Sequence, residues 1–593
     1  MRKLLKYLKE YKIQAILSPL FKMLEASFEL TVPLVVSSMI DRGIGDGKYI
    51  IRGFIILIIL GIVGLVSSCT AQYFAAKAAT GFSKGLRHDL FKHLLNLNFS
   101  QIDNIGTSTM ITRMTSDVNT VQSGVNMFLR LFLRSPFIVA GAMVMAFTID
   151  FKAALVFVGV IAILGVVVAL IMRFNIPMLK KVQKNLDGVL NLTRENISGS
   201  RVIRAFTSED HEYERFTDSN NKLSALQLKA GSVSGLLNPL TYVIINIAIV
   251  ILIFVGGNQA QKGIITTGQV VALYNYMSQI LLELIKFASL IVTINKALAS
   301  ANRISDVFEI PEGMEIADGV EGAVSKSDAT CAEKSGVAGT AKDSSFDSAS
   351  GKGYIEFKDV SLRYHDGADE SLSGISLSIE QGSTLGVIGG TGSGKSSLIS
   401  LIPRFYDVTS GSVSVDGRDV RTWDLQKLRS MVGVVMQKAV LFSGTIKDNL
   451  LWGNENATDA ELEEAVRIAQ AADVVASKGG MDALIEAAGR NLSGGQRQRL
   501  SIARALVRKP SILILDDSSS ALDNITDAAL RKSIKELDYK PTVIIVSQRT
   551  SSVQNADKIL VLDDGVMVGL GTHEELLADC EIYREIYESQ NRE

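Results

Sequence analysis

The chain has 593 residues, 47 % of them hydrophobic, which makes it too long for one domain and too apolar for an ordinary soluble protein. Its 61 basic residues nearly balance its 62 acidic residues, so the charge gives no sign of the basic surface that nucleic-acid binding requires. The three cysteines (Cys69, Cys331 and Cys580) stand singly, without metal-ligand spacing or a disulfide framework, so we expect reduced thiols.

The N-terminal stretch MRKLLKYLKEYK predicts an amphipathic helix. Its apolar side holds Leu4, Leu5, Leu8 and Tyr11, and its basic side holds Arg2, Lys3, Lys6 and Lys9. A signal peptide is not indicated, because charged residues interrupt the next apolar run and no small-residue cleavage site follows. We expect this helix to lie on the cytoplasmic membrane surface; an ordinary basic surface helix is the alternative.

Six segments are apolar over about the 20 residues that a helix needs to cross a bilayer. They lie near residues 15–40, 53–80, 127–148, 153–175, 235–256 and 268–297. Long stretches containing lysine and arginine follow the second and fourth segments, whereas the other connections are short. By the positive-inside bias these stretches and both termini are cytoplasmic. We expect a multi-pass protein of the cytoplasmic membrane, in a bacterium because no organelle presequence is present.

The composition changes abruptly after residue 310. Residues 311–353 are small, polar and nearly free of aromatic side chains, which predicts a flexible linker; a regulatory segment with phosphorylatable serines is the alternative. From Tyr354 onward the apolar runs STLGVIGG, SILILD and TVIIVS are bounded by turns, as is typical of strands buried in a parallel sheet. The predicted fold class is therefore an all-α six-helix transmembrane domain (1–310) followed by an α/β domain (354–593).

The segment GGTGSGKS fits the phosphate-binding loop pattern G-x-x-x-x-G-K-[ST] between a predicted strand and a predicted helix. We expect its backbone amides to surround the phosphates of ATP, Lys395 to reach the β and γ phosphates, and Ser396 to ligate Mg²⁺. The candidate ATP-binding residues here are Gly389, Gly390, Thr391, Gly392, Ser393, Gly394, Lys395, Ser396 and Ser397.

The segment LSGGQRQRLSIARAL begins at Leu492, and its first five residues resemble the signature motif of ABC ATPases. Six spans followed by one ATPase domain resemble, over nearly the full length, a half-transporter of the ABC exporter superfamily. The resemblance implies a dimer with domain-swapped helices, because the chain holds only one ATPase domain. It also implies that the signature residues contact ATP bound by the second subunit; these residues are Ser493, Gly494, Gly495 and Gln496.

Further positions match the family in the expected order. The matches are Tyr364 as the aromatic that stacks on adenine, Gln437 as the Q-loop, Asp516 as the Walker B carboxylate, and Ser520 and Asp523 in the D-loop. The Mg²⁺ ligands that the resemblance implies are Ser396, Gln437 and Asp516.

Two positions depart from the family pattern. Asp517 stands where the family carries a glutamate that polarises the attacking water, and Gln548 stands where it carries a switch histidine. The shorter side chain withdraws the carboxylate by roughly an ångström, a misplacement that can cost about 10²-fold in rate. Gln548 donates a hydrogen bond but does not titrate, and no histidine lies between residues 366 and 572.

These departures, with intact binding motifs, resemble the degenerate-site subunit of heterodimeric bacterial multidrug ABC exporters. The predicted function is ATP-driven export of a small amphipathic or hydrophobic substrate, with a catalytically complete partner chain in the lipid bilayer. Three alternatives stay open. One is a homodimer whose Asp517 works, since carboxylates of either length can act as bases. The others are a homodimeric lipid or peptide exporter and an ATP-gated channel or regulator.

Two segments resemble the family's coupling helices, FSQIDNIGTSTMITRMTSDV and ENISGSRVIRAFTSEDHEYERF; a solvated helix face is the alternative for their charges. Within the spans, Glu25 and Glu29 lie one turn apart, as do Glu283 and Lys286. Charges at that depth either face a cavity or form local pairs. The aromatic and polar run Tyr274, Asn275, Tyr276 and Met277 is a candidate for a substrate path or for helix packing.

Overall fold

The computed structural model describes residues 2–43, 46–314, 353–364 and 367–591. It divides into two compact units, Met1–Asn96 with Ile105–Pro311 and Leu97–Asn104 with Glu312–Glu593. Most of the predicted linker, including Cys331, lies outside the described residues. Of the two remaining cysteines, Cys69 is exposed and Cys580 is buried, and both are free thiols.

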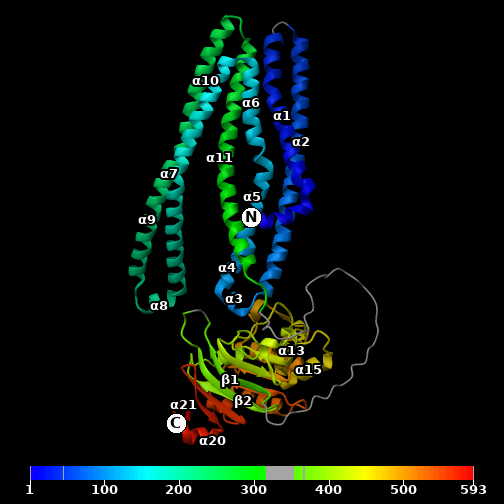
Figure 1. Ribbon diagram of the computed structural model, residues 1–593, viewed down its shortest axis with the longest axis vertical. Coiled ribbons are helices and arrows are strands. Elements are labelled where there is room, and N and C mark those ends of the chain that lie inside the picture. Colours follow the sequence, from blue (N-terminus) through cyan, green and yellow to red (C-terminus); the bar gives the residue numbers. More distant parts are fainter. Residues whose placement is uncertain (1, 44–45, 315–352, 365–366, 592–593) are drawn as a thin grey trace, which may run out of the picture. The chain divides into compact units, whose positions relative to one another are not determined.

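In the residues that the structure describes, the first unit consists of helices and short connections (Figure 1). Its elements are η1 (Arg2–Tyr11), α1 (Lys12–Gly43), α2 (Gly47–Asn96), α4 (Thr107–Thr112), η2 (Arg113–Asp117), α5 (Val118–Leu131), α6 (Arg134–Ile149), α7 (Phe151–Ser198), α8 (Ser200–Ala205), α9 (Glu209–Gly235), α10 (Leu237–Gln261) and α11 (Thr267–Glu309). Within the described residues six helical segments are long and apolar enough to cross a membrane, which confirms the predicted six-span domain.

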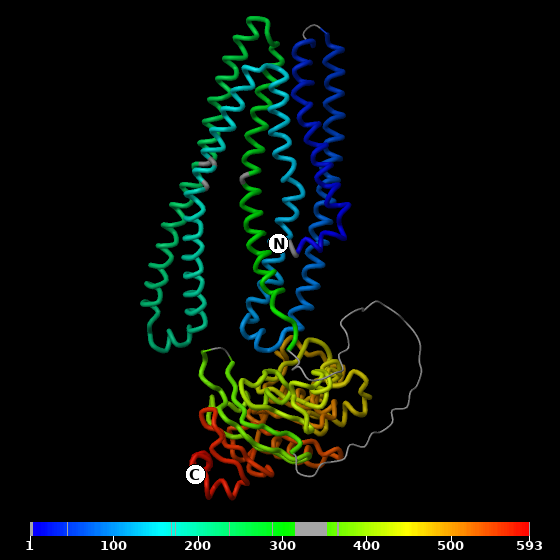
Figure 2. The backbone as a smooth tube through the Cα atoms, viewed as in Figure 1, coloured from blue at the N-terminus to red at the C-terminus, as the bar shows by residue number. Residues whose placement is uncertain are grey.

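These helices are much longer than a bilayer requires. The 50 residues of α2 extend for about 75 Å, whereas the hydrocarbon core is about 30 Å thick. Figure 2 shows α7 running beside α9 and α10 along a comparable length. The unit therefore has polar helical extensions beyond its apolar spans.

Two caps define helix starts: Asp150 accepts from the Ala153 amide at 2.7 Å, and Thr266 forms a capping box with Gln269.

The core of this unit uses small side chains that let helices approach closely. Ala26, Ala142 and Ala272 have no exposed surface and pack in one cluster with larger side chains such as Ile138 and Phe157. Small residues are favoured at such contacts because association in a membrane depends on close van der Waals packing.

The N-terminal segment, predicted as an amphipathic helix, is helical. Residues Arg2–Tyr11 form a 3₁₀-helix, not an α-helix, and pack against α2. Leu4 is buried, while the Tyr7 ring meets Phe82 edge-on and the Tyr7 hydroxyl donates to Asp89 at 2.8 Å. Of the apolar side, Leu4 therefore packs against protein, whereas Leu5 is exposed, and contact with a membrane surface stays a prediction.

The second unit is α/β. Its strands are β1 (Ile355–Leu362), β2 (Leu372–Ile379), β3 (Thr384–Gly389), β4 (Ser410–Val415), β5 (Arg418–Asp419), β6 (Val432–Val435), β7 (Gly444–Thr445), β8 (Leu484–Ile485), β9 (Ile512–Asp516), β10 (Thr542–Val546), β11 (Lys558–Asp563) and β12 (Val566–Gly571). Its helices are α3 (Phe99–Ile105), α12 (Lys395–Ser400), η3 (Val420–Thr422), α13 (Leu425–Met431), α14 (Ile446–Leu451), α15 (Asp459–Ile468), α16 (Ala472–Lys478), η4 (Ala487–Gly489), α17 (Gly494–Val507), α18 (Asn524–Lys535), α19 (Thr550–Val553), α20 (His573–Asp579) and α21 (Glu581–Asn591).

A six-stranded sheet of order β12-β11-β3-β10-β9-β6 forms the centre of this unit. All neighbours in it pair in parallel except β11 and β12. The three apolar runs predicted as buried strands are β3, β9 and β10, and every residue of β9 is buried. Their carboxyl ends meet at one edge, where ligands bind in open α/β sheets.

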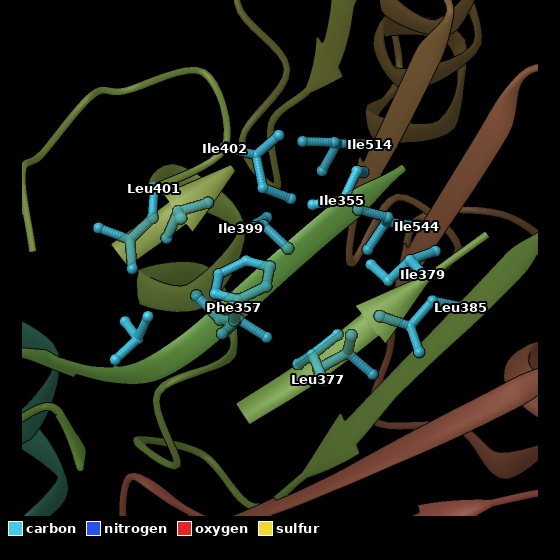
Figure 3. Close-up of a cluster of buried hydrophobic side chains, with 14 of the residues drawn as sticks. Ile355, Phe357, Leu377, Ile379, Leu385, Ile399, Leu401, Ile402, Ile514 and Ile544 are labelled. Carbon is cyan, nitrogen blue, oxygen red and sulfur yellow. The ribbon is translucent and has the colours of Figure 1, made fainter. Parts of the chain in front are cut away.

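A second, antiparallel sheet of order β2-β1-β4-β5 lies across the core from the first. Figure 3 shows Phe357 and Ile379 of this sheet, Ile399 of α12, and Ile514 and Ile544 of the parallel sheet in one cluster. The phosphate-binding helix α12 is thus held between two apolar surfaces. A core of this kind fixes the position of the loop that precedes α12.

Candidate functional site

The predicted phosphate-binding loop connects β3 to α12. Gly392 and Gly394 have φ angles of +87° and +91°, a region that glycine adopts without the penalty of a Cβ. The Lys395 Nζ donates to the carbonyls of Gly389 at 3.0 Å and Gly390 at 2.5 Å. Burial lowers the pKa of Lys395, against the opposing influence of the carboxylates of Asp517 and Asp516. The ammonium group therefore lies within the loop, beside the carboxylates at the end of β9.

Ser396 and Asp516 are brought together by the same strand order. The Ser396 hydroxyl lies 3.1 Å from both carboxylate oxygens of Asp516. Burial raises the pKa of Asp516, and the adjacent Asp517 raises it further. A divalent cation would favour the charged form of this carboxylate, and hydroxyl and carboxylate oxygens are the ligands that Mg²⁺ prefers. These two side chains fit a Mg²⁺ ion, which would neutralise phosphate charge when bound with ATP.

Asp517 occupies an unusual backbone conformation. Its φ is +44°, in the left-handed region where aspartate is several-fold enriched over most residues. Its backbone N–H donates to the Val546 carbonyl at 2.9 Å, and its side chain accepts a hydrogen bond from Gln437 Nε2 at 3.1 Å. The predicted Q-loop and the altered catalytic position are therefore in direct contact.

These side chains line one cavity of about 450 Å³, a volume suited to a small-molecule ligand. Among the predicted site residues it is lined by Tyr364, Thr391, Gly392, Ser393, Gly394, Lys395, Ser396, Ser397, Gln437, Asp516, Asp517 and Gln548. Tyr364 is half-buried, meets the Tyr406 ring edge-on and donates its hydroxyl to Ser397 at 2.8 Å. Both altered positions thus face the space that the binding residues enclose.

The cavity also has walls that the sequence motifs did not indicate. These are Asp369, Glu370, Ser371, Val546, Asp564 and Gly565. Gly565 follows β11, the strand next to β3, so the parallel pairing of those strands brings it to the cavity. In the sequence, the apolar pattern around Leu560 indicates a strand before Gly565. That pattern does not specify which strand lies beside β3, so it does not place Gly565 at the cavity.

The signature residues form a helix start rather than part of this cavity. Ser493 caps α17: its hydroxyl accepts from the Gln496 amide at 3.2 Å, and Gln496 Oε1 accepts from the Ser493 amide at 2.9 Å. A Cβ on Gly495 would lie 2.8 Å from the Ala521 carbonyl, so only glycine fits without rearrangement. The amides of Gly494 and Gly495 stay at an open helix N-terminus, which favours anions.

The predicted D-loop packs beside the signature and is ordered by its own side chains. The Ser520 hydroxyl donates to the Asp517 carbonyl at 2.8 Å. Asp523 caps α18 by accepting from the Thr526 amide at 2.9 Å, and this bond lowers the pKa of Asp523. The loop therefore connects the altered catalytic position to the start of α18.

The start of the first predicted coupling region belongs to the same compact unit as the ATPase core, whereas its remainder, from Ile105, belongs to the helical unit. Residues Leu97–Asn104 cluster with it, and the Phe99 ring stacks on Phe405 at 4.4 Å between centroids. The Tyr406 hydroxyl donates to Asp103 at 2.5 Å, and burial together with this bond raises the pKa of Tyr406. Tyr406 also contacts the Tyr364 ring, which lines the cavity. Tyr406 and Tyr364 therefore connect α3 to the nucleotide cavity.

The charged residues of the spans form two networks around buried side chains. Glu25 pairs with the buried Lys22 at 2.6 Å. Glu29 and Glu283 share Arg134, at 2.7 Å and 2.5 Å, and Glu283 also accepts from Lys286 and Ser135. The sequence prediction missed Arg134, although an arginine within an apolar span requires a partner. Tyr276 and Met277 have no exposed surface, so they pack within the chain.

A domain of six long apolar helices with an ATPase-type α/β domain defines a membrane-spanning P-loop ATPase. The model of the ABC transporter transmembrane region matches residues 15–284, and the ABC transporter model matches residues 372–520. The "Uncharacterized ABC transporter ATP-binding protein YfiB" of Bacillus subtilis is 35% identical over 100% of this chain and 98% of its own length. The chain belongs to the ABC transporter family.

Two further similarities extend over most of the chain. The "ATP-dependent lipid A-core flippase" of Hahella chejuensis is 29% identical over 92% of this chain and 88% of its own. The solved structure of a bacterial Atm1-family ABC exporter with ATP bound matches with a TM-score of 0.76 and 21% identity, over 99% of both chains. The fold is therefore that of an ABC exporter half-transporter, which works as a dimer in a lipid bilayer and couples ATP hydrolysis to transport.

Proposed function

We propose that this chain is the degenerate-site half of a heterodimeric ABC exporter. The observation that carries the proposal is that Asp517 and Gln548 line the same cavity as an intact set of binding residues. Both substitutions affect the activation of water, and neither removes a phosphate contact. Such a site retains ATP while cleaving it slowly.

Each side chain then has a defined task at this chain's own site. Lys395 and the loop amides bind the phosphates, Ser396 and Asp516 hold Mg²⁺, and Tyr364 stacks on adenine. Gln437 Nε2 donates a hydrogen bond to the Asp517 carboxylate at 3.1 Å, so the shortened side chain already has a hydrogen-bond partner within the protein. Water activation at this site is weak because the base is withdrawn and Gln548 carries no charge.

The signature of this chain serves the partner's nucleotide. Ser493, Gly494 and Gly495 present an open helix start to the ATP that the complete subunit binds, and rapid hydrolysis occurs there. Binding of two ATP molecules closes the ATPase dimer and shifts the membrane helices from inward-facing to outward-facing states, because ATP binds the closed state more tightly. Hydrolysis at the partner's site resets the cycle.

The transported molecule is a small amphipathic or hydrophobic compound, exported across a bacterial cytoplasmic membrane with both termini inside. A lipid is the second candidate, because one relative over most of the chain is a lipid A-core flippase. Inverted vesicles separate the two candidates. Uptake of an amphipathic dye with MgATP supports the first, and ATP-dependent loss of a labelled lipid from the outer leaflet supports the second.

The composition of the complex tests the heterodimer. The complex is purified from its native membrane and weighed by native mass spectrometry in the presence of MgATP. Two different chains in equal ratio are expected. Two copies of this chain would mean that Asp517 itself catalyses at a full rate, and the proposal would be wrong.

A further inference from the structure

The segment that carries Gln548 is held by the last helix of the described chain. This switch segment, Ser547–Thr550, follows β10 and enters α19. Gln590, on α21, lies against it. Its Nε2 donates to the Gln548 carbonyl at 2.7 Å, and its Oε1 accepts from the Thr550 amide at 2.8 Å and the Thr550 hydroxyl at 3.1 Å. One planar amide therefore bridges Gln548 and Thr550 within the segment.

These hydrogen bonds satisfy groups that the local sequence leaves open. The first amides of a helix have no intrahelical partner, and Arg549, which precedes α19, provides no side-chain cap. Gln590 supplies that missing acceptor from 40 residues further along the chain. Thr550 is only 2% exposed, so without Gln590 its amide would lack both a protein acceptor and ready access to water.

Gln590 acts from a fixed base because α21 is anchored in the core. Tyr583 has no exposed surface and packs with Val553 of α19 and Ile559 of β11. Its hydroxyl lies 2.7 Å from His573 Nδ1 of α20. A shift of α21 would therefore disturb this core. The packing of α21 thus fixes the position of the Gln590 amide relative to the switch segment.

We propose that Gln590 is a positioning residue for the ATP site, acting through the backbone of Gln548. By fixing the Gln548 carbonyl, it sets where the Gln548 side chain enters the cavity and contacts the terminal phosphate of ATP. The inference rests on the proposed function for the role of Gln548. It does not depend on how fast the site hydrolyses ATP.

Three variants of the full complex test this role: Gln590→Ala, Gln590→Glu and the matched control Asn591→Ala. Gln590→Glu keeps an acceptor for Thr550 but removes the donor to the Gln548 carbonyl. Asn591 is exposed, and among residues 2–43, 46–314, 353–364 and 367–591 its side chain bonds only to the Tyr587 carbonyl of its own helix. The control therefore changes the same helix end without touching the switch segment.

The measured quantity is the ratio of the dissociation constants of ADP and AMP-PNP at this chain's site, read by photo-crosslinking with azido derivatives. AMP-PNP is not hydrolysed, so the ratio can be measured even if this site hydrolyses ATP rapidly. Rapid hydrolysis would contradict the proposed function without affecting this test. We expect both Gln590 variants to lower the ratio about 10-fold with ADP affinity unchanged, about the effect of one lost hydrogen bond. Asn591→Ala should keep the ratio of the unmodified complex.

A merely structural role predicts a different pattern. Loss of packing would lower the unfolding temperature and weaken both nucleotides equally, because it would not distinguish the terminal phosphate. Equal weakening, or an unchanged ratio in both Gln590 variants, would overturn the proposal. A lowered ratio in Gln590→Glu with an unchanged unfolding temperature would support it.

Discussion

Lengthening the shortened carboxylate should restore hydrolysis at this chain's own site. The Asp517→Glu variant adds one methylene to a side chain that already faces the cavity and contacts Gln437 at 3.1 Å. The longer carboxylate extends toward the γ-phosphate by roughly an ångström, and correct placement at that scale is worth about 10²-fold in rate. In activation free energy this is about 2.7 kcal/mol.

The gain is limited by two features of the structure. The +44° φ of Asp517 is less favourable for glutamate than for aspartate, so we expect a small loss of stability, about 1 kcal/mol at most. Gln548 also remains without a titrating group. The double variant Asp517→Glu with Gln548→His should therefore cleave ATP faster than Asp517→Glu alone.

The assay follows ATP held at this chain. The complex is loaded with radiolabelled azido-ATP and Mg²⁺, freed of excess nucleotide and crosslinked at intervals, and the nucleotide on this chain is identified as ATP or ADP. The unmodified chain should retain ATP, and Asp517→Asn, the control of matched size, should resemble it. If the unmodified chain converts ATP rapidly and Asp517→Asn abolishes conversion, Asp517 is an effective base and the reasoning is refuted.

Three further predictions concern other parts of the chain. Ser493→Ala should slow ATP turnover of the whole complex by about 10-fold, because it removes the capping box at the signature helix; normal turnover would contradict the assignment of that signature to the partner's site. Arg134→Met should destabilise the membrane domain by about 3–5 kcal/mol, since Glu283 stays buried beside fewer cations; an unchanged unfolding temperature in detergent would contradict it. Phe99→Ala should lower transport while ATPase activity persists, because it removes the ring stacked on Phe405; equal loss of both activities would argue against a coupling role.

The sequence predicted the fold well where periodicity is strong. Six long apolar runs have the length that a membrane-spanning helix needs, and three short ones bounded by turns have the length of buried strands. At Arg2–Tyr11 the sequence predicted an amphipathic helix without specifying its type, and the segment forms a 3₁₀-helix. The sheet order was not predictable, because it depends on pairings between strands far apart in the chain.

The sequence predicted the parts of the candidate site that consist of residues close together in the chain. It did not predict contacts between residues that are far apart in the chain. Glu283 and Lys286 are one turn apart and could be paired from the sequence, whereas Arg134 joins them from 149 residues away. The bond from Gln590 to the Gln548 carbonyl likewise spans 42 residues. Sequence spacing does not predict such contacts, because the tertiary packing of the chain brings these residues together.

The strand register explains how hydrolysis could be weakened without loss of ATP binding. Asp516 pairs with Val546 across β9 and β10, so Asp517 and Gln548 both lie just beyond the ends of neighbouring strands. The residues proposed to bind phosphate come mainly from the loop between β3 and α12, and the core cluster that packs these two elements includes neither Asp517 nor Gln548. Changes at the two strand ends therefore leave the loop, its core and the signature helix intact. In an asymmetric dimer, ATP bound to this chain would then still contribute to the free energy that closes the ATPase dimer, while hydrolysis at the partner's site determines the rate of the cycle.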